Sequence, residues 1–189
     1  MKIDYYTPFY TNQFYHVYNR GNNGKKIFYS TRNYYHFLNL YDKYLSDCVD
    51  TYAYCLIPNH FHFLIRVRDS SVISDQFRIF FLSYSKAINK QESRTGSLFQ
   101  KRFKRTTIED TESLQWTVFY IHSNPVRHKM GKCFTNYQYS SYQSLISDKP
   151  TRLKRKELFK LFNSRENFIS FHNEKNINLK SDNFIIEDN

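Results

Sequence analysis

Residues 50–68 read DTYAYCLIPNHFHFLIRVR, two runs of β-branched and aromatic residues on either side of a Pro-Asn pair. This pattern predicts a β-hairpin with strands over residues 50–57 and 60–68 and a turn at Pro58-Asn59. Side chains alternate between the two faces of a strand. One face of the second strand is therefore apolar, with Phe61, Phe63, Ile65 and Val67. The opposite face carries His60, His62, Leu64, Arg66 and Arg68.

The segments around the hairpin predict further strands and helices. Residues 13–20 (QFYHVYNR) alternate and indicate a strand, which the glycine-rich residues 21–24 end. Residues 97–108 are expected to be a loop or a strand. Four other ranges have apolar residues at helical spacing: 31–46, 74–91, 137–146 and 154–162.

A further helix is predicted to begin at Asp110 or Thr111 and to end at Pro125. The residue before a proline avoids the α region, so Asn124 is expected just past the regular helix. His122 is expected to cap this helix or to bind a phosphate. From residue 164 onward the chain is rich in Asn and indicates a weakly ordered tail.

The order of these elements is strand, helix, strand, strand, helix, strand, helix. It is typical of an antiparallel sheet with helices packed on one face. We therefore expect an α+β fold of the ferredoxin-like type. Residues 1–147 are predicted to form the main domain, and residues 148–189 a helical extension that ends in the tail.

The composition favours a nucleic-acid partner. The 189 residues carry 28 Lys and Arg against 17 Asp and Glu, a net charge of +11, and 19% are aromatic. Cations neutralise phosphates and flat rings stack on unpaired bases, although a compositional bias toward Lys, Tyr and Phe would give the same numbers. Hydrophobic residues make up 40%, which excludes a wholly disordered chain.

Other classes of protein are excluded or disfavoured. No apolar run is long enough to span a bilayer, and the first residues, MKID, lack the apolar core of a secretory signal. Three scattered cysteines make neither a disulfide framework nor a CxxC metal site. The cytoplasm is therefore the expected compartment.

Positive charge is concentrated between residues 86 and 105. Seven basic residues face one acid there, a net charge of +6 within twenty residues. Such a run is commonly only a solvated face. It nevertheless separates the hairpin from the helix that begins near residue 110, and these two elements carry the candidate chemistry.

His60 and His62 form the first candidate site. Two residues apart on one strand, their α-carbons lie roughly 6.5 to 7 Å apart on the same face, so both rings can lean toward one metal ion. The alternative is a pair of partly exposed histidines without a ligand. Tyr120 and Asn124 form the second candidate site, because residues four apart share one face of a helix. Here the alternative is an ordinary boundary aromatic.

Together these features resemble the HUH (His-hydrophobic-His) single-tyrosine transposases, and in detail the REP-associated tyrosine transposases and their insertion-sequence relatives. The similarity covers about residues 12–147. Four stretches carry it: FYHVYNRGNN (14–23), AYCLIPNHFHFLIRV (53–67), SLFQKRFKR (97–105) and YIHSNPVRH (120–128). The resemblance implies a central antiparallel sheet with a catalytic tyrosine on a helix beside the strand of the histidine pair.

The resemblance also implies roles for individual residues. Tyr120 takes the place of the nucleophile, which forms a 5′-phosphotyrosine, and His60, His62 and Asn124 take the places of the metal ligands. Imidazole and amide ligands do not by themselves identify the metal, whereas the family resemblance implies Mg²⁺ or Mn²⁺.

DNA binding is expected to fall to eight cations, each of which is otherwise a solvated side chain: Arg20, Arg66, Arg68, Lys101, Arg102, Lys104, Arg105 and Arg127. The implied partner is single-stranded DNA that folds into a hairpin. Two alternatives to a transposase stay open, a domesticated non-catalytic protein that binds hairpin DNA and an HUH replication initiator. A monomer is favoured over a homodimer.

Overall fold

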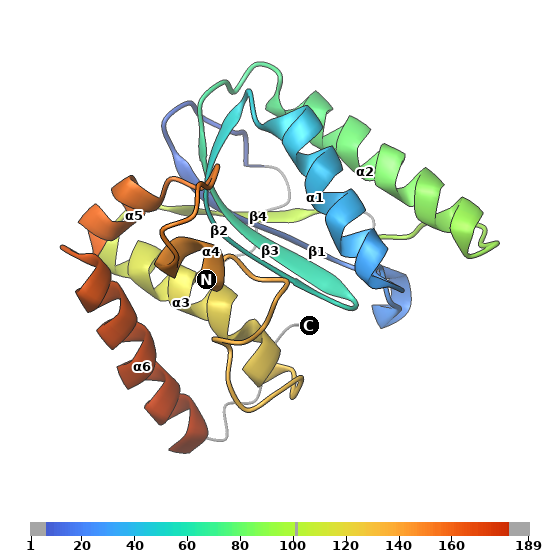
Figure 1. Ribbon diagram of the computed structural model, residues 1–189. Coiled ribbons are helices and arrows are strands. Elements are labelled where there is room, and N and C mark those ends of the chain that lie inside the picture. Colours follow the sequence, from blue (N-terminus) through green and yellow to red (C-terminus); the bar gives the residue numbers. More distant parts are fainter. Residues whose placement is uncertain (1–6, 101, 182–189) are drawn as a thin grey trace.

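The protein folds around a four-stranded antiparallel sheet (Figure 1). The computed structural model describes residues 7–100 and 102–181, with side chains as far as residue 176. The strands are β1 (Phe14–Arg20), β2 (Val49–Ile57), β3 (His60–Val67) and β4 (Lys104–Ile108), in the spatial order β2-β3-β1-β4. The predicted hairpin and the predicted strand over residues 13–20 are confirmed.

Helices cover both faces of the sheet, whereas the sequence predicted helices on one face only (Figure 1). The first face packs against α1 (Thr31–Leu45) and α2 (Ile73–Gln91). The second face packs against α3 (Thr111–Arg127), and three later helices complete the core on this side: α4 (Tyr142–Ile146), and α5 (Arg155–Leu161) and α6 (Arg165–Ser181), which contact α3. A short 3-10 helix, Asn22–Gly24, follows β1. No helix within the described residues is long and apolar enough to cross a membrane.

Each face of the sheet has its own apolar core. The first core contains Phe61, Phe63, Ile65 and Val67, as the alternation along β3 predicts. The second contains Leu64 of the opposite face, with Val118 and Phe119 of α3 and Phe168 of α6. The α+β class is therefore confirmed, and the covering of the second face explains why His60 and His62 are buried rather than exposed.

Helix α3 differs from the prediction at its C-terminal end. Asp110 caps its N-terminus by accepting a hydrogen bond from the Ser113 backbone N–H at 2.8 Å, as expected. Pro125 lies inside the helix, which continues to Arg127. A proline removes one backbone donor, and this loss falls in the last turn, where His128 N–H still bonds to Asn124 C=O at 3.0 Å. Asn124 is therefore helical.

The C-terminal segment also differs from the prediction. Residues 137–141 are not helical, and α6 occupies the region expected to be a weakly ordered tail. Phe168 is fully buried in the second core, and this packing outweighs the low helix propensity of the Asn-rich sequence. The division of the chain at residue 147 stays a prediction.

Segment 139–141 covers the outer edge of β2. The Leu56 backbone N–H bonds to Tyr139 C=O, and the Ser141 backbone N–H bonds to Tyr54 C=O, both at 2.9 Å. Cys55 and Ser140 form an antiparallel bridge between these two bonds. The sheet is thereby closed along β2 by a short piece of chain that follows α3.

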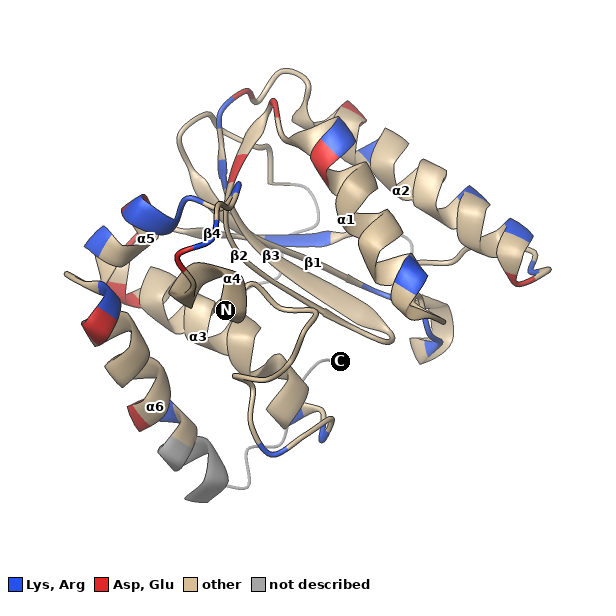
Figure 2. Ribbon diagram, viewed as in Figure 1, with Lys and Arg blue, Asp and Glu red and all other residues tan. Residues whose placement is uncertain are grey.

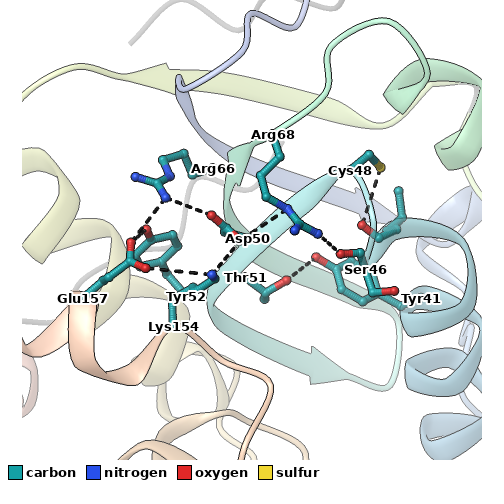
Figure 3. Close-up of polar contacts among 11 residues, drawn as sticks. Tyr41, Ser46, Cys48, Asp50, Thr51, Tyr52, Arg66, Arg68, Lys154 and Glu157 are labelled. Carbon is teal, nitrogen blue, oxygen red and sulfur yellow. Dashed lines mark hydrogen bonds and ion pairs between the residues drawn. The ribbon is translucent and has the colours of Figure 1, made fainter.

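An ion-pair cluster joins the far end of the hairpin to α5 (Figure 3). The buried carboxylate of Asp50 is bound by Arg66 at 2.9 Å, Lys154 at 3.1 Å and Arg68 at 3.4 Å. Burial alone raises the pKa of Asp50, but these three cations together lower it below its ordinary value. Glu157 completes the cluster with Arg66 at 3.3 Å and with the Tyr52 hydroxyl at 2.6 Å.

We expect Asp50→Asn to lower the free energy of unfolding by about 2 kcal/mol, the scale of a lost charge-assisted hydrogen bond at a partly buried site. The control is Asp42→Asn, because Asp42 is 38% exposed and pairs with the exposed Arg152. This variant is expected to lose less than about 1 kcal/mol of unfolding free energy. Urea denaturation followed by circular dichroism measures both. Equal losses in the two variants would contradict a structural role for the cluster.

A buried pair of histidines holds α6 against α3. His122 bonds to His172 at 2.9 Å and to the Ser141 hydroxyl at 2.8 Å, and the His172 ring donates to Phe168 C=O at 2.8 Å. His122 thus neither caps the helix nor faces a phosphate. Burial lowers the pKa of His122 well below its ordinary value and that of His172 to about 4.

This pair predicts a loss of stability in acid. Both rings are neutral in the folded protein but take up protons near pH 6.5 when it unfolds, so the free energy of unfolding falls as the pH drops from about 6.5 toward 4. The contribution of His172 is on the order of 3 kcal/mol at the acid end. Urea midpoints across this range check it. A His172→Gln variant, which does not titrate, should show a shallower decline; an equally steep one would contradict the assignment.

Candidate active site

His60 and His62 lie side by side on β3, beneath α3. Their ring centres are 5.0 Å apart, and the two residues are 5% and 2% exposed. Both project from the second face, as the alternation predicts, because the intervening Phe61 lies in the first core. The two imidazoles therefore lie in the interior rather than on an open surface.

Both ring nitrogens of His60 lie against side-chain amides. Its Nδ1 lies 2.9 Å from Asn59 Oδ1, and its Nε2 lies 2.8 Å from Asn124 Oδ1. The Asn59 amide nitrogen donates to Gly24 C=O, and that of Asn124 to Tyr120 C=O, so both amide oxygens are turned to the ring. A neutral imidazole has only one N–H. A neutral ring can therefore donate only one of these two hydrogen bonds, and its other nitrogen carries a lone pair that could bind a metal ion.

His62 offers a free nitrogen to the same region. Its Nδ1 lies 2.9 Å from His16 Nε2, while its buried Nε2 has no hydrogen-bond partner among the described residues. Burial and the neighbouring His60, His16 and His128 rings lower the pKa of His62 well below its ordinary value. The ring is therefore neutral at physiological pH, the form that binds metals.

The donor set fits a divalent cation. The buried Nε2 of His62 has no hydrogen-bond partner among the described residues, and His60 Nε2 and the Asn124 amide oxygen lie 2.8 Å apart, so two imidazole nitrogens and one amide oxygen could serve as its ligands. Within residues 7–100 and 102–176, no group of three His, Cys, Asp or Glu side chains is placed to hold a metal. With His60 and His62, the third protein ligand would thus be the Asn124 amide oxygen.

Tyr120 lies next to the histidine cluster, which consists of His16, His60, His62 and His128. Its ring is perpendicular to that of His62, with the centres 5.4 Å apart, and lies 5.8 Å from that of His16. The Arg127 guanidinium lies 5.1 Å from the Tyr120 ring centre and bonds to the Ser123 hydroxyl at 3.0 Å. Residues distant in the sequence are thus brought together by α3 crossing β3.

Lysines and arginines are spread over both sides of the sheet (Figure 2), and the contacts of the predicted DNA-binding cations divide them into three groups. Some lie on the side of the site: Arg127, Arg20, which pairs with His60 across the sheet, and Lys104, whose ammonium lies 5.7 Å from the Tyr18 ring. Arg102, in the segment that precedes β4, and Arg105 of β4 lie near α2 on the opposite face of the sheet. Arg66 and Arg68 are engaged by Asp50. Lys101 lies outside the described residues.

Two histidines of the cluster escaped the sequence prediction. His16 bonds to His62, and the His128 ring centre lies 4.4 Å from that of His60. The position of His16 could have been inferred from the strand predicted over residues 13–20, because alternation places it on the same face as Tyr18 and Arg20. The position of His128 could not be inferred in this way, because it depends on α3 continuing through Pro125.

A family model and a curated protein match this chain. A family model described as "Transposase IS200 like" matches residues 9–124, more than half of the chain. A Haemophilus influenzae protein assigned as a REP-associated tyrosine transposase is 27% identical over 103 residues, which are 49% of this chain and 58% of that protein's length. The chain thus matches less than two thirds of this relative.

The fold also matches a solved structure. A REP-associated tyrosine transposase bound to a REP hairpin superposes with a TM-score of 0.65 at 18% identity, over 78% of this chain and 87% of the other. At this identity the match concerns the fold, and the predicted architecture of a sheet with the tyrosine helix beside the histidine strand is confirmed.

Proposed function

The chain belongs to the IS200-like transposase family, and from this premise we propose that it is a metal-dependent endonuclease and strand transferase acting on single-stranded DNA with a hairpin. The observation that carries the proposal is the convergence of the Tyr120 ring with His60, His62 and Asn124. The name of the structural neighbour, which is bound to a REP hairpin, supports a hairpin as the partner. We place this activity in the cytoplasm and favour a monomer.

The reaction follows from the chemistry of a phenol. The Tyr120 oxygen forms a bond to phosphorus while the bond from phosphorus to the 3′ oxygen breaks. The phenol loses one proton and the 3′ oxygen gains one, so the products are a 5′-phosphotyrosine and a 3′-hydroxyl. Because the phosphodiester is exchanged rather than hydrolysed, attack by another 3′-hydroxyl reverses the step and joins a new strand without ATP.

The residues of the site have separate tasks in this reaction. Ionising a tyrosine phenol at neutral pH costs about 4 kcal/mol. The chemistry that a bound Mg²⁺ or Mn²⁺ supplies is polarisation of the scissile phosphate, and His60, His62 and Asn124 are the residues that would hold the ion. Arg127 places a positive charge beside the Tyr120 ring, where it can attract the phosphate.

The test is a covalent adduct. The protein is incubated with hairpin DNA that carries a single-stranded flank labelled 3′ of the cleavage point, with Mn²⁺, and resolved on a denaturing gel. A labelled band at the mass of protein plus DNA supports the proposal. No band across a series of flank sequences, in a protein that still binds the hairpin, would overturn it and leave the non-catalytic hairpin-binding alternative.

A further inference from the structure

A groove lies on the face of the sheet opposite the histidine cluster. Its volume is about 570 Å³, and it lies between α2 and the segment that leads from α2 into β4. Asn19 of β1 and Arg105 of β4 line it, and they pair across the sheet with Phe61 and Val17 of the first core. The groove is therefore separated from Tyr120 by the thickness of the sheet.

Aromatic rings line this groove. Phe81, Phe99 and Phe103 border it, with the Phe81 ring centre 5.2 Å from that of Phe99 and 5.4 Å from that of Phe103. Phe81 and Phe103 are only half-buried, and Leu82 beside them is 48% exposed. Part of the apolar lining therefore stays open to a ligand.

The polar residues of the groove are cationic or neutral. Arg78 and Arg102 are exposed, and Arg105 lies with its guanidinium 5.6 Å from the Phe103 ring centre. No acidic residue is among the described residues that line the groove, although Asp75 pairs with Arg78 at 3.2 Å from outside it. The groove thus combines stacking surfaces with anion-binding groups.

We propose that this groove binds an unpaired nucleotide of the DNA, with the base against the phenylalanines and the phosphate against Arg78 and Arg102. Base stacking on aromatic side chains together with backbone neutralisation is the chemistry of single-strand recognition. The half-buried Gln100 amide in the same groove can hydrogen-bond to base edges. This assignment rests on the proposed function only in taking DNA as the partner.

The test measures binding without a metal ion, using two fluorescent strands of about 10 nucleotides, one of thymidine and one abasic. Phe103→Leu keeps apolar packing but removes the ring. We expect it to weaken binding of the thymidine strand by about 5- to 150-fold, which corresponds to about 1–3 kcal/mol per stacked base, and to leave the abasic strand nearly unchanged. Phe171→Leu, at a half-buried ring of α6, is the control.

A second variant tests the phosphate contact without touching the core. Arg102→Gln should weaken binding of both strands and make the negative slope of log K against log salt shallower by about 0.7. Lys90→Gln, at an exposed position of α2 outside the groove, should change neither. The assignment is overturned if Phe103→Leu loses no more affinity for the thymidine strand than Phe171→Leu, or if it weakens binding of the thymidine and abasic strands equally.

The covalent-adduct assay separates this inference from the proposed function. If the wild-type protein forms an adduct but the groove variants do not affect strand binding, the proposed function is supported and the nucleotide-binding role of the groove is refuted. If the groove variants discriminate between the strands but the wild-type protein forms no adduct, nucleotide binding in the groove is supported and the endonuclease activity is refuted.

Discussion

Tyr120→Phe is expected to abolish the covalent protein–DNA adduct and to lower strand cleavage by about a thousandfold or more, since the only group assigned to attack phosphorus is lost. The substitution removes one oxygen and keeps the ring that packs against His62 and Arg127. Hairpin affinity and the urea midpoint should therefore stay close to the wild-type values. Adduct formation on a denaturing gel and affinity by fluorescence anisotropy measure the two effects.

The matched control is Tyr18→Phe. Tyr18 belongs to the same cluster, with its ring centre 5.5 Å from that of His62 and 4.8 Å from that of His16. Loss of its hydroxyl should leave the adduct in place. An adduct that persists in Tyr120→Phe, or that disappears equally in both variants, would contradict the assignment of the nucleophile.

His60→Ala is expected to weaken Mn²⁺ binding by more than about a hundredfold, because changes in residues that merely orient a ligand already cost about 10- to 100-fold. Cleavage should fall with it, whereas strand binding measured without metal should hold. Electron paramagnetic resonance of free Mn²⁺ reads the affinity independently of activity. In the wild-type protein, a chelator should stop cleavage and added Mn²⁺ should restore it.

His36→Ala provides the comparison, because His36 lies half-buried on α1, on the other face of the sheet. Its Mn²⁺ affinity should equal that of the wild-type protein. If His60→Ala folds normally and still binds Mn²⁺ as tightly as His36→Ala, the His60, His62 and Asn124 set is not the metal site.

The sequence was most informative where pattern and turn chemistry agreed. Pro58-Asn59 sets the hairpin, and alternation then places His60 and His62 on one face whatever the rest of the chain does. Tyr120 and Asn124 share a helix face by spacing alone, but the prediction stopped that helix at Pro125. A preference of one residue for extended backbone was outweighed by packing, since Asn124 and Pro125 are both buried.

Longer-range features could not be read from local patterns. The roles of Arg66 and Arg68 depend on Lys154 and Glu157 reaching Asp50, which is a property of tertiary structure. The ordering of α6 depends in the same way on a core built by β2 and α3, into which Phe168 packs. Composition marked this segment as polar, and only the partner surface explains why it folds.

The cover on the outer edge of β2 has a consequence for biosynthesis. An unprotected strand edge is a template for aggregation, and here residues 139–141 protect it in the finished protein. During translation those residues leave the ribosome long after β2, by several seconds at about 5–20 residues per second. The nascent chain therefore lacks this protection of β2 until its own later segment is synthesised.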